Sequence, residues 1–278
     1  MRPDEKVVVS HHFDALGTTC SLFACGEPVR RLVEGESWVR RLGARLTRFS
    51  PDSELSMLNA AAGRRFEISS ELESLLREAL RAHELSAGLV NVAVLPSMVA
   101  IGYSAPLLEG AGVVTLDGAA PLRPLPEVLT VRSGSARVEI GAALDLGGVA
   151  KGWMADRLCE QLGPNSVANI GGDLMAVGRG PDGRGWPMAI AGVTVLLSDQ
   201  GAATSSVLRR RWGDMHHLID PRTGRPARTG LAEVSVVGGT GIASEVMAKT
   251  ALLMGPQLAP VYCAGHAFAW WLSRTDDR

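Results

Sequence analysis

The sequence has almost no net charge and very few lysines. Its 28 basic and 29 acidic side chains leave a formal charge of −1, so no overall field would attract nucleic acid or an anionic membrane surface. We therefore expect no nucleic-acid partner. Only Lys6, Lys151 and Lys249 are lysines, and this scarcity draws attention to each of them.

Cysteines and long apolar runs are also scarce. The four cysteines form no CxxC pair, so neither a zinc site nor a disulfide framework is expected. A long uncharged stretch, residues 85–108, is interrupted by Asn91, Pro96 and Gly102, which favours a buried segment over a membrane span. Residues 1–6 contain neither the apolar stretch of a signal peptide nor a cysteine for lipid attachment, so we expect a cytoplasmic protein without membrane insertion.

The length and composition are typical of a globular protein with a large core. The chain has 278 residues, of which 46% are hydrophobic and 21% charged, and its mean hydropathy is +0.12. The low hydrophobicity and high charge of disordered chains are absent. The length suits two domains or one elaborate unit. We predict a single domain over residues 1–278, with a candidate internal linker, rich in Gly, Ala and Pro, at residues 110–126.

Periodicity and turn residues predict more strands than helices. Apolar residues spaced by three, four and seven form one face of a helix entered through Pro28, and Ser70-x-x-Glu73 predicts a capping box for a second helix that ends at Gly88. Pairs of short strand-like runs dominate the rest, with residues 11–18 as the polar connection of the first hairpin. The sequence therefore predicts an α+β fold with largely antiparallel sheets flanked by helices. The expected helices are 32–49, 70–88, 148–162 and 243–254, and the expected strands are 7–10, 20–24, 128–131, 137–140, 166–170, 188–191, 194–197, 233–237 and 267–272.

Two glycine pairs follow predicted strands and are candidate ligand-binding turns. Gly147-Gly148 opens the helix that carries Lys151, and free backbone N–H groups at such a junction, with a lysine in the first turn, form an anion site. Gly171-Gly172 comes directly after the next predicted strand and would let a ligand approach the backbone closely. Each pair can equally be an ordinary tight turn, and the spacing matches neither a Walker A loop nor a dinucleotide fingerprint.

Two further groups of polar residues are candidates for chemistry. His216-His217 is followed by Asp220 and by a Pro-Arg-Thr-Gly turn, so polar side chains of one fixed loop can point into a cleft. The histidine pair is either functional or part of the packing. Glu245 and Lys249 are i,i+4 neighbours on the last predicted helix, and an exposed salt bridge is the simplest interpretation of that spacing.

Taken together, these motifs resemble those of the ApbE family of FAD:protein FMN transferases. The resemblance extends over almost the whole chain. One such segment could arise by chance, whereas seven in the family's order would not. The matching segments are Ala15–Thr18, Phe49–Leu55 with Leu58-Asn59, Asp145–Gly152 with Asp156, Asn169–Asp173, Ala203–Ser205, His217–Pro226 and Ala243–Gly255.

The resemblance implies a metal-assisted phosphoryl transfer on FAD. A Ser or Thr hydroxyl of an acceptor protein attacks the FMN-side phosphorus, AMP leaves, and FMN stays attached to the protein through a phosphoester. Two alternatives remain open at this point: a pyrophosphatase that splits FAD into FMN and AMP, and a non-catalytic FAD-binding protein. Because the matching residues come from both ends of the chain, two interleaved subdomains with FAD in the cleft between them are expected.

Carried over position by position, the resemblance implies one catalytic residue and several FAD contacts. His217 stands at the position that we favour as the general base, a role that suits an imidazole with an ordinary pKa of about 6.5. Lys151 would lie beside the pyrophosphate, and Asn91 replaces an Asp of the family pattern, which weakens that contact. The implied FAD-binding positions are Leu16, Phe49, Leu89, Val90, Asn91, Asp145, Lys151 and Ile219.

The largest departure from the family pattern concerns the metal. The resemblance implies Mg²⁺ bound by main-chain oxygens near Gly148 and Ala150 and by two side chains that are Glu245 and Lys249 here. Glu245 is a longer carboxylate ligand than the family's Asp, but Lys249 replaces a Thr and cannot bind a metal while protonated. Thr250 is adjacent but faces about 100° away on a helix. Two interpretations stay open: Lys249 weakens magnesium binding and itself neutralises phosphate charge, or it turns to solvent and Glu245 with the main-chain oxygens retains Mg²⁺. We favour weakened magnesium binding.

Overall fold

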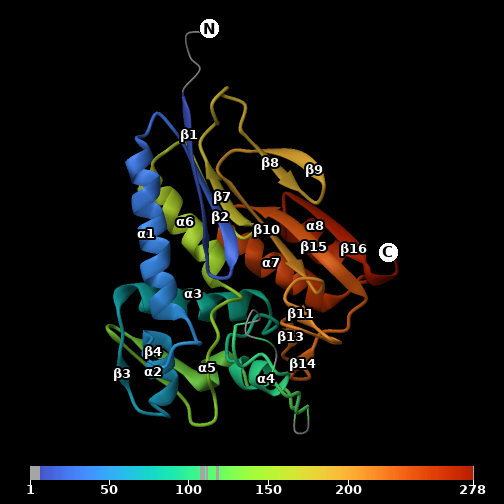
Figure 1. The fold of residues 1–278 in the computed structure, drawn as a ribbon. Coiled ribbons are helices and arrows are strands. Elements are labelled where there is room, and N and C mark those ends of the chain that lie inside the picture. Colours follow the sequence, from blue (N-terminus) through green and yellow to red (C-terminus); the bar gives the residue numbers. More distant parts are fainter. Residues whose placement is uncertain (1–6, 107–109, 111, 117–118, 278) are drawn as a thin grey trace.

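The protein folds around one seven-stranded antiparallel sheet. The computed structural model describes all residues except 1–6, 107–109, 111, 117–118 and 278. The strands of the sheet are β1 (Val8–Ala15), β2 (Thr18–Cys25), β6 (Ser166–Ile170), β7 (Asp173–Val177), β10 (Gln200–Ser206), β15 (Leu231–Gly238) and β16 (Ala269–Arg274). They follow one another across the sheet in this order, and each neighbouring pair is antiparallel (Figure 1). The predicted α+β class with antiparallel sheets is confirmed.

The first two strands form a longer hairpin than the sequence predicted. β1 and β2 pair without a break up to Ala15 with Thr18, so only Leu16 and Gly17 form the turn. Both turn residues have positive φ, +55° and +67°, as the two-residue turns that match the twist of a hairpin require. The prediction of a polar connection over residues 11–18 was wrong, because a strand with one face in solvent carries polar side chains without leaving the sheet.

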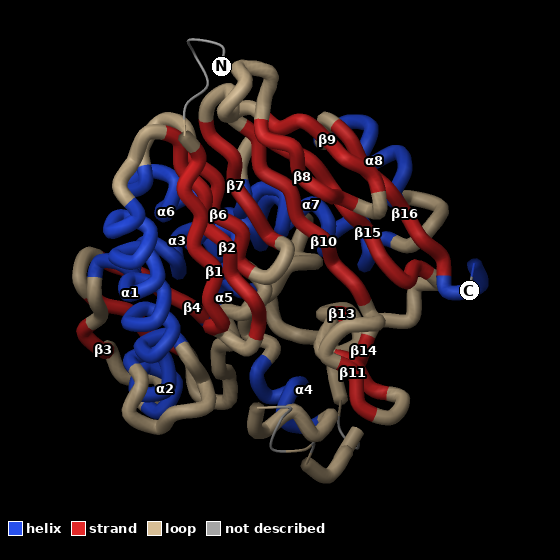
Figure 2. The backbone as a smooth tube through the Cα atoms, turned by 45° about the horizontal axis from the view of Figure 1, so that its top comes forward, coloured by secondary structure: helices blue, strands red, loops and turns tan. Residues whose placement is uncertain are grey.

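Two helices that pack on the sheet bring distant parts of the chain together. α6 (Ala150–Leu162) lies against β6 and β7, and α7 (Gly241–Met254) lies against β10 and β15 and beside α6 (Figure 2). The helices touch where each begins, since a Cβ at Gly152 would lie 2.6 Å from the main chain of Gly241. The Asp156 carboxylate fixes this contact by accepting the first two N–H groups of α7 at 2.6 and 3.0 Å. The first turns of α6 and α7 are thus in direct contact.

Four of the remaining helices belong to a second layer below the large sheet (Figure 1). α1 (Val29–Leu46) follows Pro28 as predicted and packs on β1, β2 and α6. One core cluster that includes Leu22 of β2 and Leu75 joins the two layers. The second layer contains α2 (Glu54–Ala60), α3 (Ser70–Leu85), α4 (Leu95–Ala100), α5 (Leu125–Val128) and a small sheet of β3 (Phe66–Glu67), β5 (Ser135–Val138) and β4 (Leu129–Arg132).

The cap of α3 lies one residue earlier than predicted. Ser69 is the N-cap, and its hydroxyl accepts the N–H of Leu72 at 3.3 Å. Glu73, which the predicted capping box paired with Ser70, accepts the N–H of Gly134 at 2.7 Å. The capping box was therefore wrong in detail, because the preceding serine makes the cap and leaves Glu73 to hold the β4–β5 turn.

The sequence analysis missed two central strands, β7 and β10. Neither is rich in the β-branched and aromatic residues that mark strands, and β10 consists largely of small ones. Small residues are needed in β10, because a Cβ at Gly201 would lie 2.1 Å from the main chain of Thr240. The other elements are β8 (Trp186–Ile190), β9 (Val193–Leu197), β11 (Arg211–Trp212), β12 (Met215–His216), β13 (Ile219–Asp220), β14 (Arg225–Pro226), α8 (Ala259–His266) and η2 (Thr275–Asp277).

The candidate linker at 110–126 is described only in part, since residues 111 and 117–118 lie outside the described residues. Leu122 donates its N–H to the carbonyl of Pro221 at 2.8 Å. Gly224 approaches the carbonyl of Ala120 so closely that a Cβ would lie 2.2 Å from that oxygen. The described part of this stretch therefore contacts the loop that follows the histidine pair.

The sequence predicted a cytoplasmic location and no membrane span. Residues 1–6, on which the expected cytoplasmic location depends, lie outside the described residues. From Val7 onwards, in the ranges that the structure describes, no helix combines the length and the hydropathy that a membrane span needs.

Candidate active site

Four charged side chains meet where α6, α7 and β7 converge. Lys151 stands in the first turn of α6, Asp173 begins β7, and Glu245 and Lys249 lie one turn apart on α7. Lys151 Nζ contacts Oδ2 of Asp173 and lies 3.6 Å from Glu245 Oε1, which lies 3.8 Å from Lys249 Nζ. Exposure is 17% for Lys151 and 14% for Lys249, and 3–4% for the carboxylates. Glu245 and Lys249 thus belong to a buried charge cluster of four residues, and they do not form the exposed salt bridge that their spacing alone suggests.

The backbone N–H groups at the start of α6 are mostly used inside the protein. Gly147 donates its N–H to the Asp145 side chain at 2.8 Å. Val149 and Ala150 donate theirs to the Leu146 carbonyl at 3.0 and 2.9 Å. Gly152 donates its N–H to Glu245 Oε2 at 2.9 Å. The prediction of an anion site made of free N–H groups was therefore wrong in its main part, because the Glu245 carboxylate already takes the place of an anion at this helix terminus.

Burial lowers the pKa of both lysines in the cluster. The pKa of Lys151 falls to about 8 and that of Lys249 is also lowered; loss of hydration is the main cause, and the Glu245 carboxylate opposes it. Arg210 contributes to the lowering at both lysines and also at His217, so its guanidinium acts on all three groups. The Asp145 carboxylate opposes this lowering at Lys249, so both cations and carboxylates act on that lysine.

The two neighbouring histidines differ sharply in their contacts. His216 is buried and uses both ring nitrogens: Nε2 donates to the carbonyl of Ala227 at 3.0 Å, and Nδ1 accepts the N–H of Leu218 at 3.2 Å. His217 is half-buried, and its Nδ1 is buried with no hydrogen-bond partner in the described structure. Burial and the cations nearby, Arg210 foremost, hold the pKa of His217 well below its ordinary value. The His217 ring is therefore neutral near pH 7 and available as a base, whereas His216 supports the backbone.

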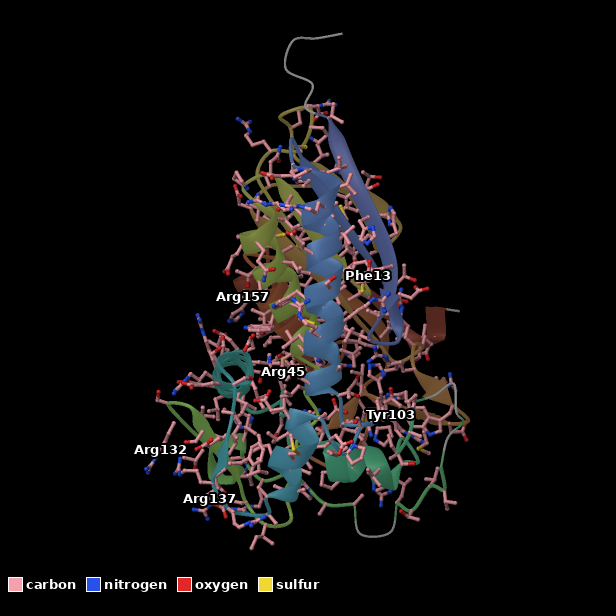
Figure 3. The ribbon with its side chains drawn as sticks, turned by 60° about the vertical axis from the view of Figure 1, so that its left-hand side comes forward. Phe13, Arg45, Tyr103, Arg132, Arg137 and Arg157 are labelled. Carbon is pink, nitrogen blue, oxygen red and sulfur yellow. The ribbon has the colours of Figure 1, made fainter. Side chains whose placement is uncertain are left out.

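Several of the implied FAD contacts form a cation–π cluster. Asp145 is ion-paired with Arg48 at 2.6 Å, and the Arg48 guanidinium lies 4.2 Å from the ring centre of Phe49 and 4.5 Å from that of Tyr103. The Tyr103 ring lies 5.2 Å from that of Trp212. Figure 3 shows Tyr103 below the tip of the β1–β2 hairpin. Phe49 remains 38% exposed, so the cluster presents an aromatic face to a ligand.

Ile219 joins this aromatic cluster to the histidine loop. It is buried and packs in one apolar cluster with Met98, Ile101 and Tyr103. Ile219 lies two residues after His217, so this apolar cluster adjoins the histidine loop. Ile219 itself is a core contact, with 6% of its surface exposed.

The implied contacts at residues 89–91 are held by bonds within the protein. Asn91 Nδ2 donates to the carbonyl of Arg123 at 2.9 Å, and its Oδ1 accepts the N–H of Ala93 at 2.9 Å. Val90 is buried and Leu89 is half-buried. Among the described residues, no hydrogen bond or ion pair of these side chains reaches the buried charge cluster. One amide hydrogen and one lone pair of Asn91 remain for a ligand.

The turn that carries Leu16 lies beside the β6–β7 turn. A Cβ at Gly171 would lie 2.5 Å from Thr18 Oγ1, so only glycine allows this approach, and the β6–β7 turn leads directly into Asp173 of the buried charge cluster. The Leu16 side chain packs on α1, where a Cβ at Gly43 would lie 2.5 Å from Leu16 Cδ2. The β1–β2 turn and the β6–β7 turn thus lie at the same end of the sheet.

The groups that the resemblance assigns to Mg²⁺ do not fit a divalent cation. Lys249 Nζ donates to the carbonyl of Gly148, one of the implied main-chain ligands, and Ala150 is buried at the first position of α6. An ammonium group therefore stands among the implied oxygen ligands and brings no lone pair of its own. Thr250 does not replace the missing hydroxyl, because its Oγ1 donates to the carbonyl one turn earlier at 2.8 Å. Within the described ranges, no three His, Cys, Asp or Glu side chains are grouped so that they could hold a metal ion.

The sequence analysis missed three charged residues of this region. Asp173 was recognised only as the end of a motif, Arg48 directly precedes Phe49, and Arg210 lies within a run of three arginines. Arginine is so common in this chain that its presence gave no signal. The run at 209–211, close before the histidine pair, was the one local indication of a concentrated positive charge.

Comparisons with known proteins show which family and which fold the chain shares. Two FAD:protein FMN transferases, from Haemophilus influenzae and Vibrio cholerae, are each 26% identical to the chain; the matches cover 98% and 92% of this chain and 88% and 84% of those proteins. The solved flavin transferase ApbE from Vibrio cholerae has a TM-score of 0.76 at 22% identity, over 96% of this chain and 97% of that one. The ApbE protein of Thermotoga maritima has a TM-score of 0.83 at 20% identity, over 98% of both chains, and such structural matches establish the fold. The ApbE family profile matches residues 16–269. The chain therefore belongs to the ApbE family.

Proposed function

We propose that this protein transfers FMN from FAD to a Ser or Thr hydroxyl of an acceptor protein and releases AMP. The observation that carries the proposal is the buried, unpartnered Nδ1 of His217 near the cations Lys151, Lys249 and Arg210. Phosphoryl transfer to a hydroxyl needs a base for the hydroxyl proton and positive charge at the phosphates. The relatives named FAD:protein FMN transferase, which match most of the chain, support the same reaction.

In the proposed reaction each residue of the centre has one task. His217 takes the proton of the acceptor hydroxyl, whose oxygen forms a bond to the FMN-side phosphorus of FAD. The bond from that phosphorus to the bridging oxygen breaks, and AMP leaves with the oxygen and its electron pair. Lys151 and Lys249 bind the pyrophosphate and offset the charge that moves onto the bridging oxygen. His217 then returns its proton to water.

The surrounding residues would bind the two halves of FAD. Phe49 offers an exposed aromatic face for stacking, and Asp145 keeps the guanidinium behind that ring in place. The turn at Leu16 and the segment 89–91 complete the proposed pocket on the sheet side and the helical side. Magnesium is implied by the resemblance, but no step is assigned to it, because Lys249 stands among its implied ligands.

A single set of product measurements tests the proposal. The protein is incubated with FAD and an extract of cells that naturally contain it, which supplies the acceptor. AMP is measured by chromatography and protein-bound flavin by fluorescence after acid precipitation. A transferase gives AMP and bound flavin in equal amounts, a pyrophosphatase gives AMP with free FMN, and a non-catalytic FAD-binding protein gives no AMP. Protein carrying His217→Asn is the matched control.

A further inference from the structure

Lys249 is a candidate for the second positive charge, beside that of Lys151, at the phosphates of FAD. Lys249 is 14% exposed, so it is not a mobile surface lysine. Its Nζ donates to the carbonyl of Gly148 and lies 3.8 Å from Glu245 Oε1. Main-chain oxygen and carboxylate are also the kind of ligands that a hard divalent cation takes. The ammonium group therefore stands in a cation's coordination environment.

The oxygen atoms around this position are already engaged. Glu245 Oε2 accepts the N–H of Gly152 at 2.9 Å, and its Oε1 lies between Lys151 Nζ, at 3.6 Å, and Lys249 Nζ. Magnesium needs near-ideal octahedral oxygen geometry. A Mg²⁺ ion here would have to displace an ammonium group from the Gly148 carbonyl and then remain beside it, against charge repulsion.

The charges inside the cluster, before FAD binds, balance without a metal. The ammonium groups of Lys151 and Lys249 balance the carboxylates of Asp173 and Glu245 inside the cluster. Arg210 adds a cation that acts on both lysines. A pyrophosphate diester brings two negative charges, and an ammonium group offers up to three N–H donors to them.

We propose that the Lys249 ammonium replaces the divalent cation in this chain, so that it binds FAD and transfers FMN without a metal ion. This inference rests on the proposed function for the identity of the anion. The absence of a divalent-cation site at Gly148 and Glu245 is a separate claim, which can be tested on the protein without FAD.

The test combines a metal titration with an activity measurement. Mn²⁺ is titrated into the metal-free protein and free Mn²⁺ is followed by electron paramagnetic resonance, with Mg²⁺ as competitor. The proteins are the wild type, Lys249→Thr and the control Arg157→Thr, which removes one positive charge from the exposed side of α6 (Figure 3). AMP release from FAD, in the presence of the acceptor extract, is then measured in EDTA and in excess Mg²⁺.

We expect no saturable Mn²⁺ binding by the wild type or by Arg157→Thr, and binding at least about tenfold tighter in Lys249→Thr, because the repelling charge is gone. AMP release by the wild type should be the same in EDTA and in Mg²⁺. One tight, Mg²⁺-competed Mn²⁺ site in the wild type, or loss of its AMP release in EDTA, overturns the inference. These wild-type results hold even if Lys249→Thr does not fold. Absence of AMP in every condition would contradict the proposed function, and the Mn²⁺ titration would still decide on the metal.

Discussion

Replacing His217 by Asn removes the proposed base and keeps a polar side chain in the loop. General base catalysis contributes about 10²–10⁴-fold to a rate, which corresponds to about 3–5 kcal/mol of activation free energy. We therefore expect kcat for AMP release to fall by that factor. FAD affinity should be nearly unchanged, because the lysines that bind the pyrophosphate remain.

The neighbouring histidine supplies the matched control. His216 bonds the Ala227 carbonyl and the Leu218 N–H, so His216→Asn leaves buried backbone groups unsatisfied, at a cost of about 1–3 kcal/mol each. His217 Nδ1 has no such partner to lose. The expected pattern is a loss of rate with normal stability for His217→Asn, and a loss of stability with modest loss of rate for His216→Asn.

The assays are AMP release under saturating FAD in the presence of the acceptor extract, FAD binding by flavin fluorescence, and urea unfolding of both variants. A reversed pattern, in which His216→Asn abolishes AMP release in folded protein while His217→Asn stays active, would refute the assignment. It would also show that the resemblance had been aligned one residue out of register in this loop.

Three further predictions follow from the charges. Lys151→Gln should weaken FAD binding by about 1.5–3 kcal/mol, the worth of a hydrogen bond to a charged group, and weaken FMN binding much less; equal losses in calorimetric titrations would contradict the pyrophosphate contact. Because the pKa of His217 is held below 6.5 and that of Lys151 falls to about 8, kcat/KM should decline on the alkaline side around pH 8 and on the acid side only below pH 6.5; an acid limb centred above 6.5 would argue against His217 as the base. Burial also lowers the pKa of His83, which donates Nδ1–H to the carbonyl of Val90 and accepts the N–H of Leu125. Since the unfolded chain then binds the proton more readily, this part of the stability is present above pH 6.5 and is lost as the pH falls below it. The pH dependence of the free energy of unfolding, measured with urea, should differ between the wild type and His83→Gln. The same pH dependence in both proteins would contradict the interpretation.

Local signals in the sequence were enough for much of the fold. The strand at 166–170 is confirmed with its predicted bounds, and the helix predicted at 148–162 is α6. β10 was missed because its small residues serve contacts with the start of α7, and such contacts leave no periodic pattern. Here tertiary packing, and not local preference, decides that the segment is a strand.

Some residues of the candidate site could be singled out from the sequence, but their arrangement could not. The scarcity of lysine drew attention to Lys151 and Lys249, and both lie in the buried charge cluster. The Glu245 carboxylate accepts the N–H of Gly152, a residue 93 positions away in the sequence. No local pattern could therefore reveal that this carboxylate occupies the expected anion site. The roles of His216 and His217 likewise separate only through contacts with distant backbone groups.

The central claim is that an acceptor hydroxyl, and not water, attacks the FMN-side phosphorus of FAD. The most direct measurement is a reaction in water enriched in oxygen-18, with mass spectrometry of the released AMP and of the flavin-bearing peptide from the acceptor. We predict FMN in phosphoester linkage to a Ser or Thr, with no label in its phosphoryl group or in AMP. Label in FMN would show hydrolysis, and label in AMP would show attack on the other phosphorus; either result would contradict FMN transfer by this protein.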